Sequence, residues 1–187
     1  MKYLRFLALS AAAVTLTAGL GACSKQPDVA FSYDGVVYSV ADMDQALNDY
    51  YAVTGKTLDT QTVLTSLITS QVVIETAKKD YQLEVSDADA ASVLKQVQQQ
   101  SEGTGALENL GRGILDLAKA TALSTEMTSR ADTQTLNQQF DQTMADAQKS
   151  INPRYGVKAT STNIEAISAF GDVVLPGATT TNTGTTK

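Results

Sequence analysis

The stretch from residue 59 to residue 79 constrains the fold of this chain more than any other part. Its apolar residues recur every three or four positions, which is the period of an α-helix, and they cover more than one stripe: Val63, Leu64, Leu67, Ile68, Val72, Val73 and Ile74. A helix that is apolar over so much of its circumference is buried on several sides. A strand over 72–74 is the alternative, but the run's length and the alanine and lysines behind it favour a helix. The sequence therefore predicts a mainly α-helical domain with this helix at its centre.

A shorter helix is predicted before the central one. Ser39 can cap its first turn, and Asp42 stands three residues later, as in a capping box. Apolar and aromatic residues then follow at helical spacing: Val40, Met43, Leu47, Tyr50 and Thr54. Gly55 suits the left-handed residue that ends many helices.

Three more helices are predicted after the central one. The first begins at the cap signal 86–89 and breaks at the polar run 98–103. The next starts at Leu107 and continues toward Arg130, although Gly111 and Gly113 weaken its first turns by roughly 1 kcal/mol each relative to alanine. The last follows a stripe of apolar residues: Leu136, Phe140, Met144, Ala147 and Ile151. Asn152-Pro153 should stop it, because proline disfavours a helix at the residue before it.

A β-hairpin is predicted over residues 29–40, ahead of all the helices. Asp34-Gly35 is a strong signal for a tight turn that needs positive φ at both central residues, and aromatic and β-branched residues flank it. Two strands alone are marginally stable, so the hairpin must pack on the helices. The fold class is therefore mainly α, with about five helices and a small N-terminal β-hairpin.

The N-terminal residues indicate export. A basic start with Lys2 and Arg5 precedes an apolar run over 6–16, and together they are typical of a secretory signal peptide. The sequence Leu20-Gly21-Ala22-Cys23 resembles the lipobox of bacterial lipoproteins. That resemblance implies cleavage between Ala22 and Cys23 and lipid on Cys23, hence a protein held on the outer face of the cell membrane. The alternatives are a stray cysteine or a transmembrane anchor, but a span needs about 20 apolar residues and this run is shorter.

Composition excludes several classes of chemistry. Cys23 is the only cysteine and the chain has no histidine, so disulfides, cysteine–histidine metal sites and histidine-based catalysis are all excluded. The net charge is −6 and becomes more negative once Lys2 and Arg5 are removed, which argues against nucleic acid as a partner. We therefore expect no enzyme, no cofactor and no metal, although a hydrolase that uses two carboxylates stays open as a minor alternative.

Four stretches of the chain resemble the N-terminal chaperone domain of SurA, in the trigger-factor and SurA-like group. They are the hairpin and capped helix 29–47; the Val63-Leu64-x-x-Leu67-Ile68 pattern followed by Ile74, Ala77 and Lys78; Leu83 to Asp87; and Ile151 to Gly156. The resemblance implies a helical domain in which a returning C-terminal strand joins the N-terminal hairpin. It also implies binding of unfolded polypeptides without chemistry. The parvulin isomerase module of that family has no room in this chain.

These observations divide the chain into a lipoprotein signal peptide over 1–22, a lipidated tether over 23–28, a SurA-like helical domain over 29–175 and a disordered threonine- and glycine-rich tail over 176–187. The predicted function is a lipid-anchored extracytoplasmic holdase that binds newly exported polypeptides; the alternative is a lipoprotein that docks on one membrane or cell-wall complex. Tyr51 and Met127 are the candidate peptide-binding residues. Tyr50 is expected in the core, and the residues 152–156 are expected to be structural, with Arg154 paired to a carboxylate.

Overall fold

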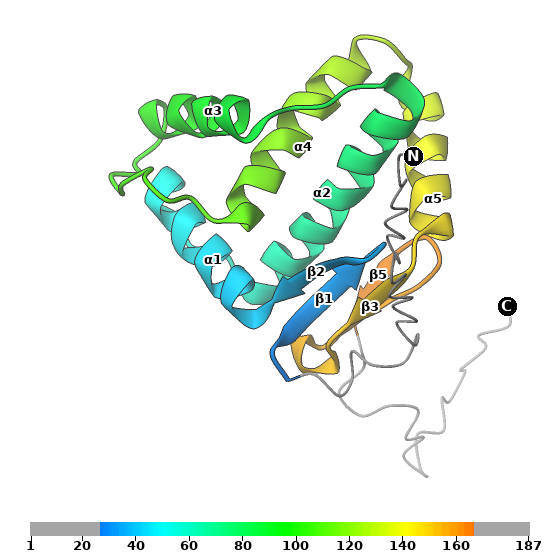
Figure 1. Cartoon of the computed structure of the whole chain (residues 1–187), viewed down its shortest axis with the longest axis horizontal. Coiled ribbons are helices and arrows are strands. Elements are labelled where there is room, and N and C mark those ends of the chain that lie inside the picture. Colours follow the sequence, from blue (N-terminus) through cyan, green and yellow to red (C-terminus); the bar gives the residue numbers. More distant parts are fainter. Residues whose placement is uncertain (1–26, 167–187) are drawn as a thin grey trace, which may run out of the picture.

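The computed structural model describes residues 27–166. Their elements follow one another along the chain as β1 (Val29–Tyr33), β2 (Val36–Ser39), α1 (Val40–Thr54), α2 (Thr60–Tyr81), α3 (Asp87–Gln99), α4 (Arg112–Thr128), α5 (Thr133–Asp146), β3 (Lys149–Ile151), a short 3-10 helix (Pro153–Tyr155), β4 (Val157–Ala159) and β5 (Ile164–Ala166). In Figure 1 the strands lie along one side of the helices, α3 lies at the far end from the sheet, and α5 borders the side opposite α1. The mainly helical class is confirmed.

The sheet joins the two ends of the described chain. Its strand order is β2-β1-β3, and both pairings are antiparallel, with Phe31 opposite Ile151 in the second. The turn between β1 and β2 has positive φ at both Asp34 (44°) and Gly35 (81°), which confirms the predicted tight turn. Strand β3 therefore returns from the C-terminal side and adds a third strand to the predicted hairpin.

Asp28, which we assigned to the tether, belongs to the folded body, because its carbonyl accepts a hydrogen bond from the Val40 amide at 2.7 Å.

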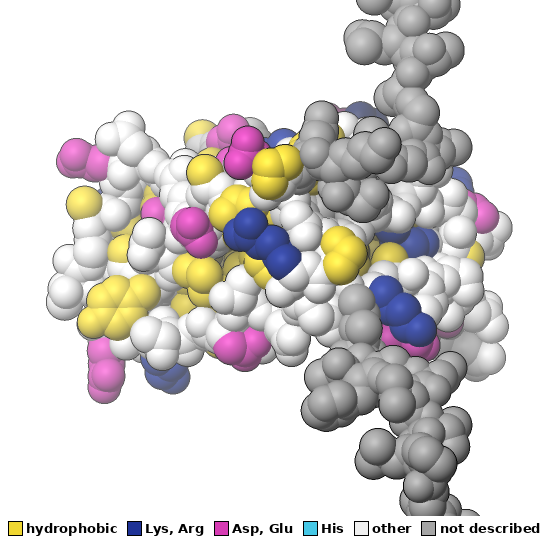
Figure 2. Space-filling view, turned by 90° about the horizontal axis from the view of Figure 1, so that it is seen from below, with side chains coloured by type: hydrophobic (Ala, Val, Ile, Leu, Met, Phe, Trp, Pro, Cys, Tyr) yellow, Lys and Arg dark blue, Asp and Glu magenta, His cyan; other side chains and the backbone are white. Residues whose placement is uncertain are grey.

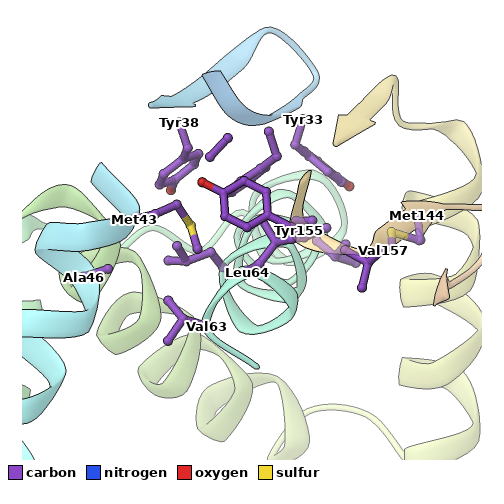
Figure 3. Close-up of a cluster of buried hydrophobic side chains, with 14 residues drawn as sticks. Tyr33, Tyr38, Met43, Ala46, Val63, Leu64, Met144, Tyr155 and Val157 are labelled. Carbon is purple, nitrogen blue, oxygen red and sulfur yellow. The ribbon is translucent and has the colours of Figure 1, made fainter. Parts of the chain in front are cut away.

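The largest hydrophobic cluster lies between this sheet and helices α1, α2 and the end of α5. Phe31 and Tyr38 stack with their ring centroids 4.4 Å apart, and both are fully buried. Figure 3 shows Met43, Leu64 and Tyr155 grouped beneath the strands that carry Tyr33 and Tyr38. Burial of these large side chains supplies the apolar face that a small sheet needs for stability.

Helix α2 is central, as predicted. Its buried residues belong to two hydrophobic clusters: Val63 through Val72 face the sheet cluster, whereas Val73 and Ala77 face a second cluster with α4 and α5. Its most extensive helix contact is with α4, which runs beside it in Figure 1. The predicted caps are also confirmed: Ser39 and Asp42 form a capping box on α1, Gly55 is its left-handed end, and Ser86 caps α3.

The predicted start of the fourth helix is wrong. Helix α4 begins at Arg112 rather than at Leu107, because Gly111 adopts an extended conformation as its N-cap and its amide donates to Asp49 Oδ2 at 2.7 Å. Leu107 and Leu110 lie in the preceding loop and still pack against the third cluster, which α1, α3 and α4 share. Leu107 and Leu110 have helical spacing although they lie in a loop, and this spacing led to the prediction of an earlier helix start.

The predicted end of the fifth helix is also wrong. Helix α5 ends at Asp146, and Ile151 lies in β3, where it pairs with Phe31. Asn152-Pro153 does not stop α5; Asn152 caps the 3-10 helix instead, with its side chain accepting from the Arg154 amide at 3.2 Å. The guanidinium of Arg154 lies over the Tyr155 ring and donates to the Pro27 carbonyl, so its predicted carboxylate partner is replaced by a ring and a main-chain oxygen.

Candidate functional site

The predicted lipidation and cleavage residues, Ala22 and Cys23, lie outside the described residues, as do the signal peptide and the tail over 176–187. Within residues 27–166, no helix has the length and hydropathy required to cross a membrane. The site that the structure does describe is a surface hollow among the helices.

An apolar groove opens where α1, α2, α3 and α4 meet. It has a volume of about 420 Å³ and is lined by Tyr50, Val53, Thr54, Leu58, Thr62, Val63, Ser66, Val93, Leu94, Val97, Ile114, Leu117, Ala118 and Thr121. Most of these side chains are apolar, and the polar ones carry only hydroxyl groups. No charged side chain of the described residues lines the groove. Such a surface suits apolar side chains of a ligand, with a few hydroxyl oxygens that can accept hydrogen bonds from it.

The groove exists because α3 covers α1 and α4 only in part. Ala90 and Leu94 are the buried residues of α3, and they close the third cluster against Val53, Ile114 and Ala118. The next apolar residue along that face, Val97, is 39% exposed. Helix α3 therefore contributes a buried residue, Leu94, and a partly exposed one, Val97, to the groove wall.

A second, polar hollow of about 540 Å³ lies on the other side of the first turns of α2. It is lined by Asp59, Gln61, Thr62, Thr65, Ser66, Val157 and Ile164. Thr62 and Ser66 line both hollows. The two hollows are therefore neighbours across one face of α2, with β4 and β5 forming the far wall of the second.

The structure separates the two candidate peptide-binding residues. Tyr51 is 57% exposed on α1, which fits a surface role, but it lines neither hollow in the described part of the chain. Met127 is fully buried in the second cluster with Val73 and Leu136, so its assignment to a binding surface is wrong. The neighbour of Tyr51, Tyr50, is half-buried and lines the apolar groove. Sequence periodicity identified Tyr50 as apolar-facing but not as part of an open surface.

Exposed apolar surface elsewhere is scattered. The large apolar residues most exposed within 27–166 are Val37, Tyr51 and Val97, which lie on β2, α1 and α3. Figure 2 shows separate apolar patches, with acidic and basic side chains between them, on the face seen from below. Of these three residues only Val97 lines the apolar groove.

No match was found among protein-family models, curated proteins or solved structures. The likeness to SurA rests on the sequence stretches alone, and function must be argued from the site.

A buried polar network lies at the junction of β2, α2 and α4. The Asp116 carboxylate accepts from the Tyr38 hydroxyl, from Gln71 Nε2 at 3.2 Å and from Lys119 Nζ at 3.2 Å, and Arg112 Nε lies 3.4 Å from it. Burial and the neighbouring Asp116 carboxylate raise the pKa of Tyr38 well above its usual range, which keeps the hydroxyl protonated as a donor. Within the described residues no buried side-chain nitrogen or oxygen lacks a hydrogen-bond partner. This network is a structural junction.

The carboxylates with raised pKa lie apart from both hollows. Partial burial raises the pKa of Asp49, although its hydrogen bond from Gly111 opposes the shift. Partial burial and the nearby Asp34 raise the pKa of Glu75. Neither residue lines a hollow, and within residues 27–166 no cluster of acidic side chains could hold a metal ion. The two-carboxylate arrangement that a hydrolase would need is therefore not assembled in the described hollows.

Proposed function

We propose that this protein is a lipid-anchored extracytoplasmic holdase that binds apolar segments of unfolded or newly exported polypeptides without catalysing a reaction. One observation carries the proposal: the groove among α1, α2, α3 and α4 is apolar, open and uncharged. An unfolded chain offers the chemistry that such a groove accepts, because its apolar side chains are exposed and its backbone groups can bond to hydroxyls.

The chemistry of the groove wall favours weak binding of low sequence specificity. The hydroxyls of Thr54, Thr62 and Thr121 already donate within the protein, to the Tyr50 carbonyl, to Asp59 Oδ2 and to the Leu117 carbonyl. Toward a ligand they therefore serve as acceptors. No charged side chain of the described residues enforces a particular ligand sequence in the groove. Both properties suit a chaperone that must accept many clients and release them.

An aggregation assay tests this function. The chain beginning at Ser24 should suppress aggregation of a chemically unfolded protein at a few-fold molar excess. Val97→Glu places a charge on the groove wall at a residue that is already 39% exposed, so suppression should fall while the fold is kept. Val37→Glu is the matched control, because Val37 is 48% exposed on β2 and lines neither described hollow. Equal loss in both variants, or no suppression by the parent chain, would contradict the proposal.

The membrane anchor is tested separately. Cys23→Ser should move the protein from the membrane to the soluble fraction and abolish incorporation of labelled palmitate, because two or more acyl chains are what makes lipid anchoring stable. Retention of the Cys23→Ser protein on membranes would refute the anchor.

Affinity purification of the lipidated protein distinguishes the docking alternative from the holdase. A single stoichiometric partner would favour docking, and a range of exported proteins would favour the holdase.

A further inference from the structure

The polar hollow adds a charge to the edge of the apolar groove. Of the side chains that line either hollow in the described structure, only Asp59 carries a charge at neutral pH. Lys56 lies three positions earlier in the same loop and lines neither hollow, and Lys158 on β4 is paired with Glu165 on β5 at 3.6 Å. The charge presented beside the groove is therefore negative.

Asp59 is held as a carboxylate by the first turn of α2. Its Oδ1 accepts from the Thr62 amide at 2.9 Å and its Oδ2 accepts from the Thr62 hydroxyl at 2.5 Å. These hydrogen bonds hold the pKa of Asp59 below its usual range. The positive end of the α2 dipole offsets part of the charge, but each oxygen has a further lone pair for a ligand.

Thr62 connects this charge to the groove. The residue that binds Asp59 through its amide and hydroxyl is also one of the two residues that line both hollows. A polypeptide with apolar side chains in the groove therefore reaches Asp59 within a few residues of extended chain, since each residue spans about 3.3 Å.

We propose that the two hollows together select one class of segment: an apolar stretch with a lysine or arginine on one flank, the apolar part in the groove and the basic side chain against Asp59. This inference rests on the proposed holdase function and names the preferred client chemistry. Acidic flanks are disfavoured by repulsion from the same carboxylate, and uncharged flanks are intermediate.

The chain supplies its own matched control for this idea. The tetrapeptide Asp-Thr-Gln-Thr occurs at 59–62 and again at 132–135. At the second copy Asp132 caps α5 in the same way, accepting from the Thr135 amide at 2.9 Å and from its hydroxyl at 3.0 Å. Asp132 lines neither hollow. Asparagine caps a helix as well as aspartate does, so Asp59→Asn and Asp132→Asn remove equivalent charges and keep both caps.

The test measures fluorescence anisotropy of labelled peptides that share one apolar core and carry two lysines, two serines or two glutamates on one flank. The protein is the chain from residue 23 to residue 187 with Cys23→Ser, and thermal unfolding verifies that each variant is folded. At low salt the lysine peptide should bind about three- to tenfold more tightly than the glutamate peptide. Asp59→Asn should remove that preference, whereas Asp132→Asn should keep it.

Three outcomes overturn the inference. Equal binding of all flanks refutes the preference but leaves the holdase proposal standing. A preference that survives Asp59→Asn, or that is lost equally in Asp132→Asn, assigns the selectivity to overall charge rather than to Asp59. Failure of every apolar peptide to bind refutes both this inference and the proposed function.

Discussion

Asp116 joins three elements of the fold through one buried carboxylate. It lies on α4 and binds Tyr38 of β2, Gln71 of α2 and Lys119 of its own helix. Lys119 in turn lies 2.6 Å from Asp87 at the start of α3. A buried charge of this kind is tolerated because it is fully hydrogen-bonded, so its stabilising effect depends on every partner being present.

Asp116→Ala should lower the free energy of unfolding by about 2 to 4 kcal/mol, because it leaves the Tyr38 hydroxyl buried without an acceptor and removes one of the two acceptors of the Gln71 amide. Asp116→Asn keeps the shape and one acceptor, so its cost should be about half as large. Urea unfolding of each variant measures the two changes in the free energy of unfolding. The control is Glu126→Ala on the same helix as Asp116, which breaks a solvent-exposed pair with Arg130 just beyond the helix end and should cost at most about 0.5 kcal/mol. Equal costs for Asp116 and Glu126 would contradict the buried network.

Sequence reasoning identified single residues well where a local rule applied and poorly where burial depended on neighbouring elements. Ser39, Asp42 and Ser86 are the caps that their spacing predicted. Met127 was misplaced, and Tyr50 packs against the third cluster as expected but also lines the groove. Periodicity tells which face of a helix is apolar, not whether another helix covers that face. In the structure α5 covers Met127, whereas α3 stops short of covering Tyr50 completely.

At the scale of elements, Gly113 shows why a poor helix former stands in α4. A Cβ built on Gly113 would lie 2.7 Å from the Cβ of Ala46 on α1 and 3.4 Å from Leu67 Cδ2 on α2. The glycine thus allows α1 and α4 to approach closely, and the loss of about 1 kcal/mol in helix propensity is the cost of that contact.

Gly113→Ala should therefore destabilise the protein by about 1 to 3 kcal/mol, although alanine is the better helix former. Ala46→Gly removes the atom that the new Cβ would meet, so the double variant Ala46→Gly with Gly113→Ala should recover part of the loss. A double-mutant cycle from chemical unfolding measures that coupling. Additive effects of the two substitutions, or a gain in stability from Gly113→Ala alone, would show that the helices do not meet here.

The contact between the β1–β2 turn and α2 should make stability depend on pH. Partial burial and the carboxylate of Asp34 raise the pKa of Glu75, while Lys79 opposes and Asp146 adds to that shift. A raised pKa means that the folded protein binds this proton more tightly than the unfolded chain. The stabilisation is therefore complete below 4.5, the ordinary pKa of a glutamate, and is lost as the pH rises through the raised value.

Glu75→Gln should accordingly be more stable than the parent at neutral pH, by about 0.5 kcal/mol after screening by solvent, and the difference should vanish in acid. Thermal unfolding across the pH range measures it. Glu84→Gln is the control, because Glu84 forms an exposed pair with Lys78 at 3.3 Å and should gain nothing at neutral pH. A stability gain that does not change with pH would contradict the role of the proton.

Element boundaries mark the limit of sequence reasoning here. The side-chain caps of α1 and α3 were predicted, whereas the cap of α5 at Asp132 was not. The start of α4 at Gly111 has no side-chain cap and depends on Asp49 of another helix. The end of α5 was missed because Ile151 fits a helical stripe and a strand equally well in a short segment. Only its long-range pairing with Phe31 decides between them.

At the scale of the whole molecule, the mainly helical class, the central α2 and the hairpin were predictable, because they follow from periodicity and turn chemistry. The groove was not, since it depends on how far α3 extends over α1 and α4. Helix α3 buries only Ala90 and Leu94, whereas α2 is buried on faces toward two clusters. Free energies of local opening follow the apolar area that an element buries, so α3 should be the least firmly held wall of the groove.

Hydrogen exchange followed by mass spectrometry tests this difference and its link to function. Amides of α3 should exchange faster than those of α2, and an apolar peptide should slow exchange in α3 through contact with Val93, Leu94 and Val97. Helix α5 supplies the control, because none of its residues lines the groove, so its exchange should not change. If α3 and α2 exchange equally, the groove is a rigid pocket. If the peptide slows α5 as much as α3, it stabilises the whole domain and the groove is not its binding site.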